Sequence, residues 1–319
     1  MNDFSALLEQ AYSKRSALLE LTDAFRVVNG SNDGFPGVAI DRYGDRFQIQ
    51  YFGPELLSQE QMIVAAVQKV FAPKFLVSKF RLSPSGKSLE KPEMHVDFGS
   101  ESESSTVVRE GNCRFHVDLL DTVNPGLFLD MRDGRLDVEA RARGKEVLNL
   151  FSYTCSFAVH ARIGGATRAV NADISGKILE KGRENYRLNG IEPLKGEFFK
   201  GDSREYLAWC LRKGLHFDGV VLDPPSFSRN KGKVFSVKND FQTLVSEVAG
   251  LLAPGAFFLA STNYSAMTPE SLAKETLKTV KVRFPNAKIA WAHGQGPDFP
   301  GSGTRKESAL SAVMIDVGK

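Results

Sequence analysis

Beyond residue 144, short apolar segments alternate with segments of helical character. The apolar ones read KEVLNLF, RAVNADIS, EFFKGD, FDGVVLDPP, GAFFLAST, KIAWAHG and LSAVMIDV. Helical stretches separate them, such as the amphipathic GKILEKGRENYRLNG, which ends at Asn189–Gly190. Buried strands that alternate with helices are typical of a doubly wound, mostly parallel sheet. The sequence therefore predicts an α/β fold for this part of the chain.

The residues before this region predict a smaller α+β domain. Residues 5–21 place apolar pairs at helical spacing and predict one amphipathic helix. Strand-like runs cover Val38–Ile40 and Phe47–Phe52. A helix near residues 58–71 and a strand over Phe75–Phe80 follow them.

A stretch rich in Ser, Pro, Gly, Lys and Glu covers residues 83–105 and predicts a surface loop or a domain boundary. We therefore divide the chain into three parts. These are an N-terminal helix (1–24), a small α+β domain (25–105) and a larger α/β domain (106–319).

The composition is that of an ordinary globular protein and narrows the function only slightly. Hydrophobic residues make up 42% and charged residues 25%, and a net charge of +3 does not by itself indicate a nucleic-acid binder. The three cysteines form no CxxC pair and the five histidines show no metal-ligand spacing. The N-terminus lacks a signal-peptide pattern, and no apolar run is long enough to cross a bilayer. We expect a cytoplasmic protein without a metal or a membrane anchor.

Sheets of this kind bind ligands beyond the carboxyl ends of their strands. The first strand ends in NLFSYTCSF, which lacks the G-x-G-x-x-G motif of dinucleotide-binding folds. Ser152, Thr154 and Ser156 open the next helix instead, and their oxygens and nearby free N–H groups could receive a carboxylate. Simple helix capping explains these residues equally well.

Aspartates follow the next two strands. Asp173 stands where it could accept both hydroxyls of a ribose, and Asp202 could bond an adenine amino group. Each could instead cap a helix, and for Asp202 taken alone capping is the better explanation. Three such strand ends without a phosphate-binding glycine loop indicate a nucleoside that carries no pyrophosphate. S-adenosylmethionine fits, because a sulfonium joins its adenosine to an amino acid.

The fourth strand ends in LDPPSFSRNKGK. Proline has no N–H and a fixed φ, so Asp223–Pro224–Pro225 predicts a rigid turn whose carbonyls can accept hydrogen bonds. A carboxylate and a carbonyl that both accept from a base NH₂ would favour the pyramidal nitrogen that attacks a methyl group, and Phe227 could stack on the base. The RNKGK that follows offers cations to phosphates. A structural proline turn and a solvated basic loop are the simpler alternatives.

Five segments, taken in order, resemble those of one enzyme family. They read NPGLFLDMRDGR (124–135), VLNLFSYTCSF (147–157), NADIS (171–175), NYRLNG (185–190) and LDPPSFSR (222–229). Together they resemble the bacterial large-subunit (23S) ribosomal RNA methyltransferases. That family belongs to the Rossmann-like, class I superfamily of S-adenosylmethionine-dependent enzymes and includes cytosine-C5 and guanine-N7 enzymes. The resemblance spans about residues 25–319.

The resemblance implies an S-adenosylmethionine site built from successive strand ends. The residues that would line the methionine end of the cofactor are Asn149, Phe151, Ser152, Tyr153, Thr154 and Cys155. Asp173, with Ile174 beside it, would hold the ribose, and Asp202 with Ser203 would flank the adenine.

It also implies where cofactor and target base meet. Asp223, Pro224 and Pro225 would form that junction, with Phe227 against the base. Phe128 and Arg132 would face the cofactor or substrate, although ordinary helix entry explains their segment as well. PDFP at 297–300 resembles a C-terminal loop of the family, and both a substrate lid and a surface turn remain open for it.

The chain departs from the family pattern in its cysteines. Cys155–Ser156 stands where relatives often have Gly-Gly, and Thr262 stands near the position of the nucleophilic cysteine of the C5 enzymes. C5 methylation needs a thiolate, which threonine cannot supply. None of Cys113, Cys155 and Cys210 is an obvious substitute.

The family's N-terminal RNA-binding module of PUA type has no counterpart here beyond one helix. RNA docking is therefore expected from the small domain and from two basic loops. The residues we single out in these loops are Arg81, Lys87, Arg229, Lys231 and Lys233. The N-terminal helix could pair two protomers in a homodimer or cover the small domain.

The leading interpretation is methyl transfer from S-adenosylmethionine to a base nitrogen in RNA, with 23S ribosomal RNA or its assembly intermediates as the partner. One alternative is cytosine-C5 methylation with a cysteine that the fold brings close. The others are an RNA-binding protein without catalysis and a methyltransferase with a protein or small-molecule substrate.

Overall fold

The computed structural model describes residues 3–82, 88–230, 233–301 and 310–318, which form two compact units. Unit 1 comprises Met1–Asp130 and Gly296–Ser308, and unit 2 comprises Met131–Gln295 and Ala309–Lys319. This division differs from the sequence-based boundaries at 24/25 and 105/106.

The physical reason is a set of hydrogen bonds that ties the segment after residue 105 to the N-terminal residues. Thr22 and Glu110 form an isolated antiparallel β-bridge. The Arg109 guanidinium donates to the carbonyls of Leu19 (2.8 Å) and Leu21 (2.9 Å).

Unit 2 is built around a seven-stranded sheet. Its strands are β8 (Glu146–Leu150), β9 (Arg168–Asp173), β10 (Phe198–Lys200), β11 (Phe217–Leu222), β14 (Leu252–Thr262), β15 (Lys288–His293) and β16 (Ser311–Asp316). They lie in the order β10-β9-β8-β11-β14-β16-β15. The first five are parallel, and β16 runs antiparallel to both of its neighbours. The predicted doubly wound, mostly parallel sheet is confirmed.

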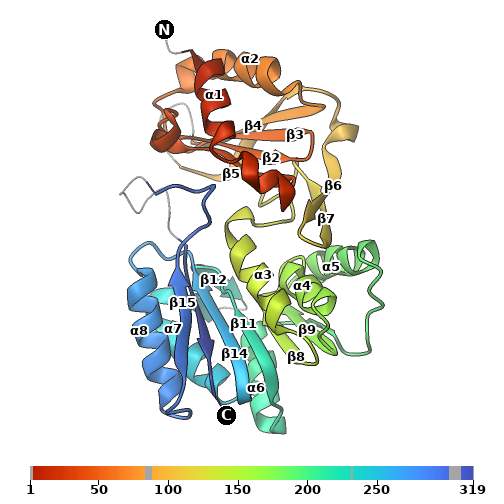
Figure 1. Ribbon diagram of the computed structural model, residues 1–319, viewed down its shortest axis with the longest axis vertical. Helices are drawn as coiled ribbons and strands as arrows, with labels where there is room; N and C mark the ends of the chain where they lie inside the picture. The colour runs from red at the N-terminus through yellow and green to blue at the C-terminus, as the bar shows by residue number, and fades with distance from the viewer. Residues whose placement is uncertain (1–2, 83–87, 231–232, 302–309, 319) are drawn as a thin grey trace. The chain divides into compact units, whose positions relative to one another are not determined.

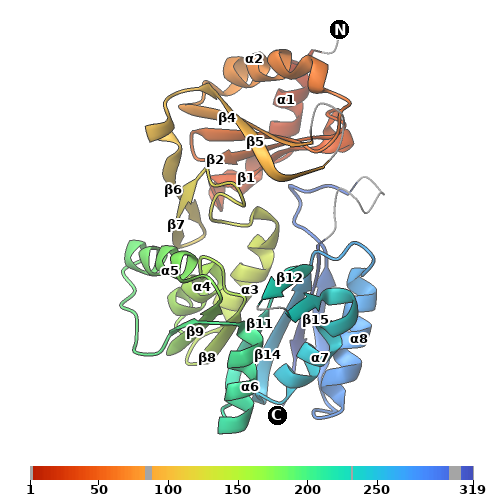
Figure 2. The ribbon, with the colours of Figure 1, turned by 180° about the vertical axis from the view of Figure 1, so that it is seen from behind.

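Helices cover both faces of this sheet. They are α3 (Arg132–Arg141), α4 (Ser156–Ile163), α5 (Gly176–Leu188), α6 (Ser203–Lys213), α7 (Val237–Ala249) and α8 (Pro269–Lys281). Figure 1 shows α3 and α4 in front of the sheet, and Figure 2, seen from behind, shows α6 and α7. The apolar sides of α6, α7 and α8 pack with strand residues such as Leu148, Val220 and Phe258 in one buried cluster. A short hairpin, β12 (Phe227–Asn230) and β13 (Lys233–Ser236), precedes α7.

Unit 1 holds a second, five-stranded sheet. Its strands, in spatial order, are β1 (Ala24–Asn29), β2 (Val38–Tyr43), β3 (Arg46–Tyr51), β4 (Phe75–Leu82) and β5 (Ser88–Phe98). Helices α1 (Phe4–Ser13) and α2 (Glu60–Phe71) pack on one face through a common apolar cluster. The hairpin of β6 (Ser105–Glu110) and β7 (Cys113–Asp118) follows. Short 3₁₀ helices are η1 (Ser16–Glu20), η2 (Gly30–Asp33), η3 (Leu57–Gln59), η4 (Glu101–Glu103) and η5 (Leu129–Met131).

Some local predictions for unit 1 are wrong. The helix expected over 5–21 ends at Ser13, and a 3₁₀ helix follows it; between the two, the buried Arg15 side chain donates to Asp33 and to the Ala11 carbonyl. Within the stretch expected to be a loop, residues 88–98 form β5. This strand is polar and contains Pro92, and it exists because β4 offers it a free edge to pair with.

Among the residues that the structure describes, no helix has the length and apolar character needed to cross a bilayer.

Candidate active site

The carboxyl ends of four parallel strands of unit 2 lie side by side. Leu150 of β8 pairs with Ala172 of β9 and with Leu222 of β11, and Leu222 pairs in turn with Ala260 of β14. The chain order of the strands reverses on the two sides of β8, which is where open α/β sheets bind their ligands. The register therefore brings together the four segments that follow these strands.

The loop after β8 has an unusual backbone. Phe151, Tyr153 and Cys155 have φ values of 57°, 47° and 63°, in a conformation that residues other than glycine rarely adopt. Each such residue costs on the order of 1–3 kcal/mol and persists only where surrounding contacts enforce it. Strain of this kind concentrates at functional sites.

Hydrogen bonds from the neighbouring strand ends enforce this conformation. The Phe151 N–H donates to Ser203 Oγ (3.0 Å), the Ser152 N–H to the Ala172 carbonyl (3.1 Å) and the Tyr153 N–H to Asp173 Oδ2 (3.0 Å). The Cys155 N–H donates back to the Ser152 carbonyl (2.8 Å). The expectation of free N–H groups in this loop is therefore wrong for these four residues, because the fold already uses them. They cannot form the cradle that a pyrophosphate requires.

Cys155 occupies the N-cap of α4. A Cβ added at Gly182 of α5 would lie 2.4 Å from the Cys155 sulfur. The bulk of Cys155 is thus accommodated by the missing side chain of Gly182. Burial raises the pKa of the Cys155 thiol.

Asn149, Thr154 and Ser203 are buried and tie the loop to its surroundings. The Asn149 amide donates to Asn171 Oδ1 (3.0 Å), and the Thr154 carbonyl accepts from Asn185 Nδ2 (3.0 Å). Ser203 Oγ, which accepts from Phe151, also donates to the Ala172 carbonyl (2.9 Å). These contacts fix the loop from behind.

Asp173 ends β9 and is half-buried. Its two oxygens each accept one backbone N–H, Oδ2 from Tyr153 (3.0 Å) and Oδ1 from Ser175 (2.9 Å). Desolvation raises the pKa of this carboxyl. A carboxylate oxygen can accept more than one hydrogen bond, so both oxygens retain capacity for a diol. Ile174, next in the chain, is 53% exposed and offers an apolar surface beside it.

Asp202 acts as a helix cap. It is the N-cap of α6, accepts from the Arg204 N–H (2.9 Å) and forms an ion pair with the Arg204 guanidinium (2.7 Å). The capping explanation left open for this residue is confirmed.

Asp223 follows β11 directly and is partly exposed. The Ser261 hydroxyl donates to Asp223 Oδ1 over 2.6 Å, the length typical of a charge-assisted bond. Ser261 is fully buried near the end of β14 and therefore holds the carboxylate in one orientation. No motif marks Ser261 in the sequence. Only the pairing of β11 with β14 could have indicated it.

The residues after Asp223 lead from the interior to the surface. Pro224 is buried, Pro225 is exposed, and the Phe227 side chain is 52% exposed. Phe227 begins the β12–β13 hairpin, in which Arg229 pairs with Val234 and Asn230 with Lys233.

Two of the predicted RNA contacts, Lys87 and Lys231, lie outside the described residues. Arg229 and Lys233 are placed by their backbone on the two strands of the hairpin. Arg81 lies in β4 of unit 1, is partly buried and donates to Gln50 Oε1 (3.2 Å).

Phe128 and Arg132 fall in different units. Phe128 lies in unit 1 and is 39% exposed, whereas Arg132 begins α3 of unit 2 and is buried.

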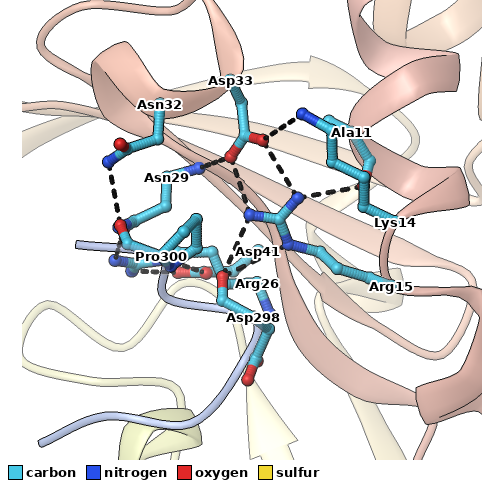
Figure 3. A network of polar contacts seen from close by, with 10 residues as sticks. All are labelled: Ala11, Lys14, Arg15, Arg26, Asn29, Asn32, Asp33, Asp41, Asp298 and Pro300. Carbon is cyan, nitrogen blue, oxygen red and sulfur yellow. Dashed lines mark hydrogen bonds and ion pairs between the residues drawn. The ribbon is translucent and has the colours of Figure 1, made fainter. Parts of the chain in front are cut away.

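The Pro297–Pro300 segment is part of unit 1 and forms a turn held by buried contacts. Asp298 is fully buried; its Oδ2 accepts from the Arg26 N–H (3.0 Å), and its carbonyl accepts from Arg15 Nε and Nη2 (3.2 Å each). The Pro300 carbonyl accepts from Asn29 Nδ2 (2.9 Å) (Figure 3). The segment does form a turn, in which the Phe299 N–H donates to the Gly296 carbonyl (3.0 Å) and Pro297 is exposed, but buried polar contacts of Asp298 fix it in place, so it is not a free lid.

The apolar side of α1 is also used within unit 1. Phe4, Leu8 and Ala11 are buried in the core of that unit. Of the two expectations for the N-terminal helix, covering the small domain is confirmed.

The strand order, the switch point beside β8 and the acidic strand ends are those of a class I methyltransferase. Comparison with known proteins agrees. Residues 54–304 match the family described as S-adenosylmethionine-dependent methyltransferase, and the chain belongs to this family.

Two relatives have names that specify ribosomal RNA. One is YwbD of Bacillus subtilis (strain 168), named provisionally as a ribosomal RNA large subunit methyltransferase; it is 33% identical over 267 residues, which cover 82% of this chain and 67% of YwbD. The other is ribosomal RNA large subunit methyltransferase I of Klebsiella pneumoniae (strain 342), 31% identical over 85% of this chain and 68% of its own.

A solved structure extends the similarity to nearly the whole fold. The crystal structure of SMU.776 in complex with SAH has a TM-score of 0.84 and 28% sequence identity, and the match covers 98% of this chain and 81% of that one.

The donor set at the strand ends fits S-adenosylmethionine. Asp173 can accept a ribose diol, and the loop amides that a pyrophosphate would need are engaged within the fold. The protein is thus an S-adenosylmethionine-dependent methyltransferase.

Proposed function

We propose that this enzyme methylates a base nitrogen in RNA and that its substrate is large-subunit ribosomal RNA. The observation that carries the proposal is Asp223, held by Ser261 at the same sheet edge as Asp173. The names of YwbD and of the Klebsiella enzyme support ribosomal RNA as the substrate class.

The cofactor would lie along the ends of β8, β9 and β10. Asp173 would accept the ribose hydroxyls, and Ile174 would cover one face of the adenine. Asp202 and Ser203, at the start of α6, would flank the adenine edge. The Phe151–Cys155 loop would shape the methionine end, and its enforced backbone means that little reorganises when the cofactor binds. Arg132 and Asn149, both in unit 2, would keep the places that the family resemblance implies, facing the cofactor and lining its methionine end.

The acceptor base would lie against Asp223 and Phe227. The Asp223 carboxylate and a proline carbonyl would accept from the base NH₂, which turns the nitrogen lone pair toward the methyl donor. When bound, S-adenosylmethionine supplies an electrophilic methyl group, which bonds to the nitrogen as the sulfur keeps the electron pair of the broken bond. The methylated nitrogen then carries a surplus proton, which Asp223 can accept and pass to water. The exposed Phe227 ring would hold the base by stacking, worth about 1–3 kcal/mol.

The cysteines support a nitrogen target over cytosine C5. Cys113, Cys155 and Cys210 are all buried, and burial raises the pKa of the Cys155 and Cys210 thiols. A nucleophilic cysteine needs the opposite, an accessible thiol with a lowered pKa. If 5-methylcytosine were nevertheless the product, one of the three Cys→Ser variants would lose all activity.

Methyl transfer from labelled S-adenosylmethionine to unmodified 23S ribosomal RNA, followed by mass spectrometry of the digested nucleosides, tests the proposal. We expect an N-methylated base, and we expect Asp223→Ala to abolish its formation while the variant still binds cofactor. Asp218→Ala is the matched control, because Asp218 lies near the opposite end of the same strand, where it accepts from the Glu146 N–H (2.9 Å). Full activity of Asp223→Ala would overturn the mechanism, and methylation of a protein or small molecule alone would overturn the substrate class.

A further inference from the structure

A groove on unit 2 lies outside the site described above. It has a volume of about 680 Å³ and runs between α8 and the strand β15. β15 is the last strand in the sheet order, so its outer edge has no neighbouring strand among the described residues. The volume falls within the ~300–1,000 Å³ that ligand-binding clefts span.

Lysines form one side of this groove. Lys274, Lys278 and Lys281 all line it and are all exposed. Their spacing of four and then three residues places them on one face of α8. Seven residues of helix extend about 10 Å, a length over which one strand of a duplex presents about three phosphates.

The charge of the groove is not balanced by acids. Glu270 is the single acid that lines it, against three lysines. The other acid of α8, Glu275, points elsewhere and accepts from Gln242 Nε2 of α7 (3.1 Å). A multiply charged anion would therefore meet a net positive surface.

The floor of the groove is apolar. Leu277 and Ile289 contribute to it together with two alanines, and Ile289 is 39% exposed. Lysine stems can cover such a floor while their ammonium groups stay in water, and ribose rings can pack on it.

We infer that this groove binds the sugar-phosphate backbone of the RNA substrate, an inference that rests on the proposed function. Its contacts would position the RNA without distinguishing one base sequence from another, because phosphates and riboses are the same at every nucleotide. A second copy of the chain is a poorer fit. Two-fold pairing would set the lysines against the same lysines, and lysine is depleted at protein interfaces.

The test uses the full-length protein and an unmodified 23S ribosomal RNA transcript. The variant Lys274→Gln/Lys278→Gln/Lys281→Gln removes the three charges. The matched control, Lys195→Gln/Arg212→Gln/Lys213→Gln, removes three exposed positive charges elsewhere on unit 2. In each triple variant, two of the three substituted residues lie in the last turn of a helix. Binding of S-adenosylmethionine, measured by calorimetry, reports whether each variant is folded.

We expect the groove variant to bind RNA more weakly, with a salt dependence shallower by about 2 in the slope of log affinity against log salt. Between 50 and 200 mM salt, the wild type should then lose about 16-fold more affinity than the variant. The control should keep the wild-type slope, and both variants should bind cofactor normally.

Three results would overturn the inference while the proposed function stands. The first is an unchanged slope of log affinity against log salt in the groove variant, and the second is an equal change of that slope in the control. The third is a groove variant that loses self-association and keeps its RNA affinity, which would identify the occupant as a second copy of the chain. If the wild type neither binds nor methylates this RNA, the proposed function fails as well, and the two failures are thereby distinguished.

Discussion

At the scale of single residues, the orientation of Asp223 depends on a neighbour from another strand. Ser261 is buried and reaches Asp223 Oδ1 at 2.6 Å. A hydrogen bond to a charged group contributes about 1.5–3 kcal/mol. Ser261→Ala should therefore lower kcat about 10-fold or more, because the carboxylate no longer has a fixed orientation. Cofactor affinity should not change, and a Ser261→Ala enzyme with wild-type kcat would show that the bond does not position the reacting group.

The proposed role of Asp173 as the ribose acceptor predicts that cofactor binding depends on pH. Desolvation raises its pKa above the ordinary value of 3.8, so it takes up a proton at a higher pH than a solvated aspartate. Ribose hydroxyls that donate to the ionised form would lower that pKa, so cofactor binding should release a proton. Affinity should fall as the pH falls through the raised pKa.

Calorimetry in buffers of different ionisation enthalpy measures this proton. Asp173→Asn should release none and should bind cofactor about 10–100-fold more weakly. Proton release that persists in Asp173→Asn would assign the effect to another group.

At the scale of elements, the fit of α4 against α5 depends on one missing side chain. Gly182→Ala would place a Cβ 2.4 Å from the Cys155 sulfur and 3.1 Å from its Cβ. Overpacking of this kind costs about 1–3 kcal/mol of stability. Cys155→Gly removes the opposing atoms, so the double variant should recover most of the loss. Thermal unfolding of the single and double variants forms a double-mutant cycle, and additive effects would contradict the contact.

The strand ends around the proposed site show how much of it the sequence can predict. Asp173 and Asp223 could be located because Asp173 ends one apolar strand and Asp223 directly follows another, and parallel strands end at one edge. Ser261 could not, because its relation to Asp223 depends on which strands are neighbours. The positive φ values of Phe151 and Tyr153 were equally hidden, because no glycine signals them and the enforcing bonds come from distant residues.

At the scale of the whole molecule, the chain passes between its two units three times, after Asp130, Gln295 and Ser308. Gly296–Ser308 thus separates two strands that pair with each other in unit 2, β15 and β16, and itself belongs to unit 1. From the sequence alone, this segment was expected to belong to the larger domain, because it lies between two strands of that domain along the chain. Its buried hydrogen bonds to residues nearly three hundred positions away could not be anticipated from local pattern.

Asp298 provides the test of this arrangement. Asp298→Ala removes the carboxylate that accepts the Arg26 N–H and leaves that part-buried donor without this partner, at a cost of about 1 kcal/mol. Arg15 keeps its two hydrogen bonds to Asp33 (2.7 and 3.1 Å) (Figure 3). The stability of unit 1 should therefore fall, but the unit should still fold. Amide hydrogen exchange should accelerate in β1 and η2 and stay unchanged in β8 and β9, and cofactor affinity should be that of the wild type.

The control is Glu9→Ala, an exposed change on α1, which should alter stability by less than about 0.5 kcal/mol. Faster exchange in β8 and β9 would mean that the segment stabilises the catalytic sheet itself.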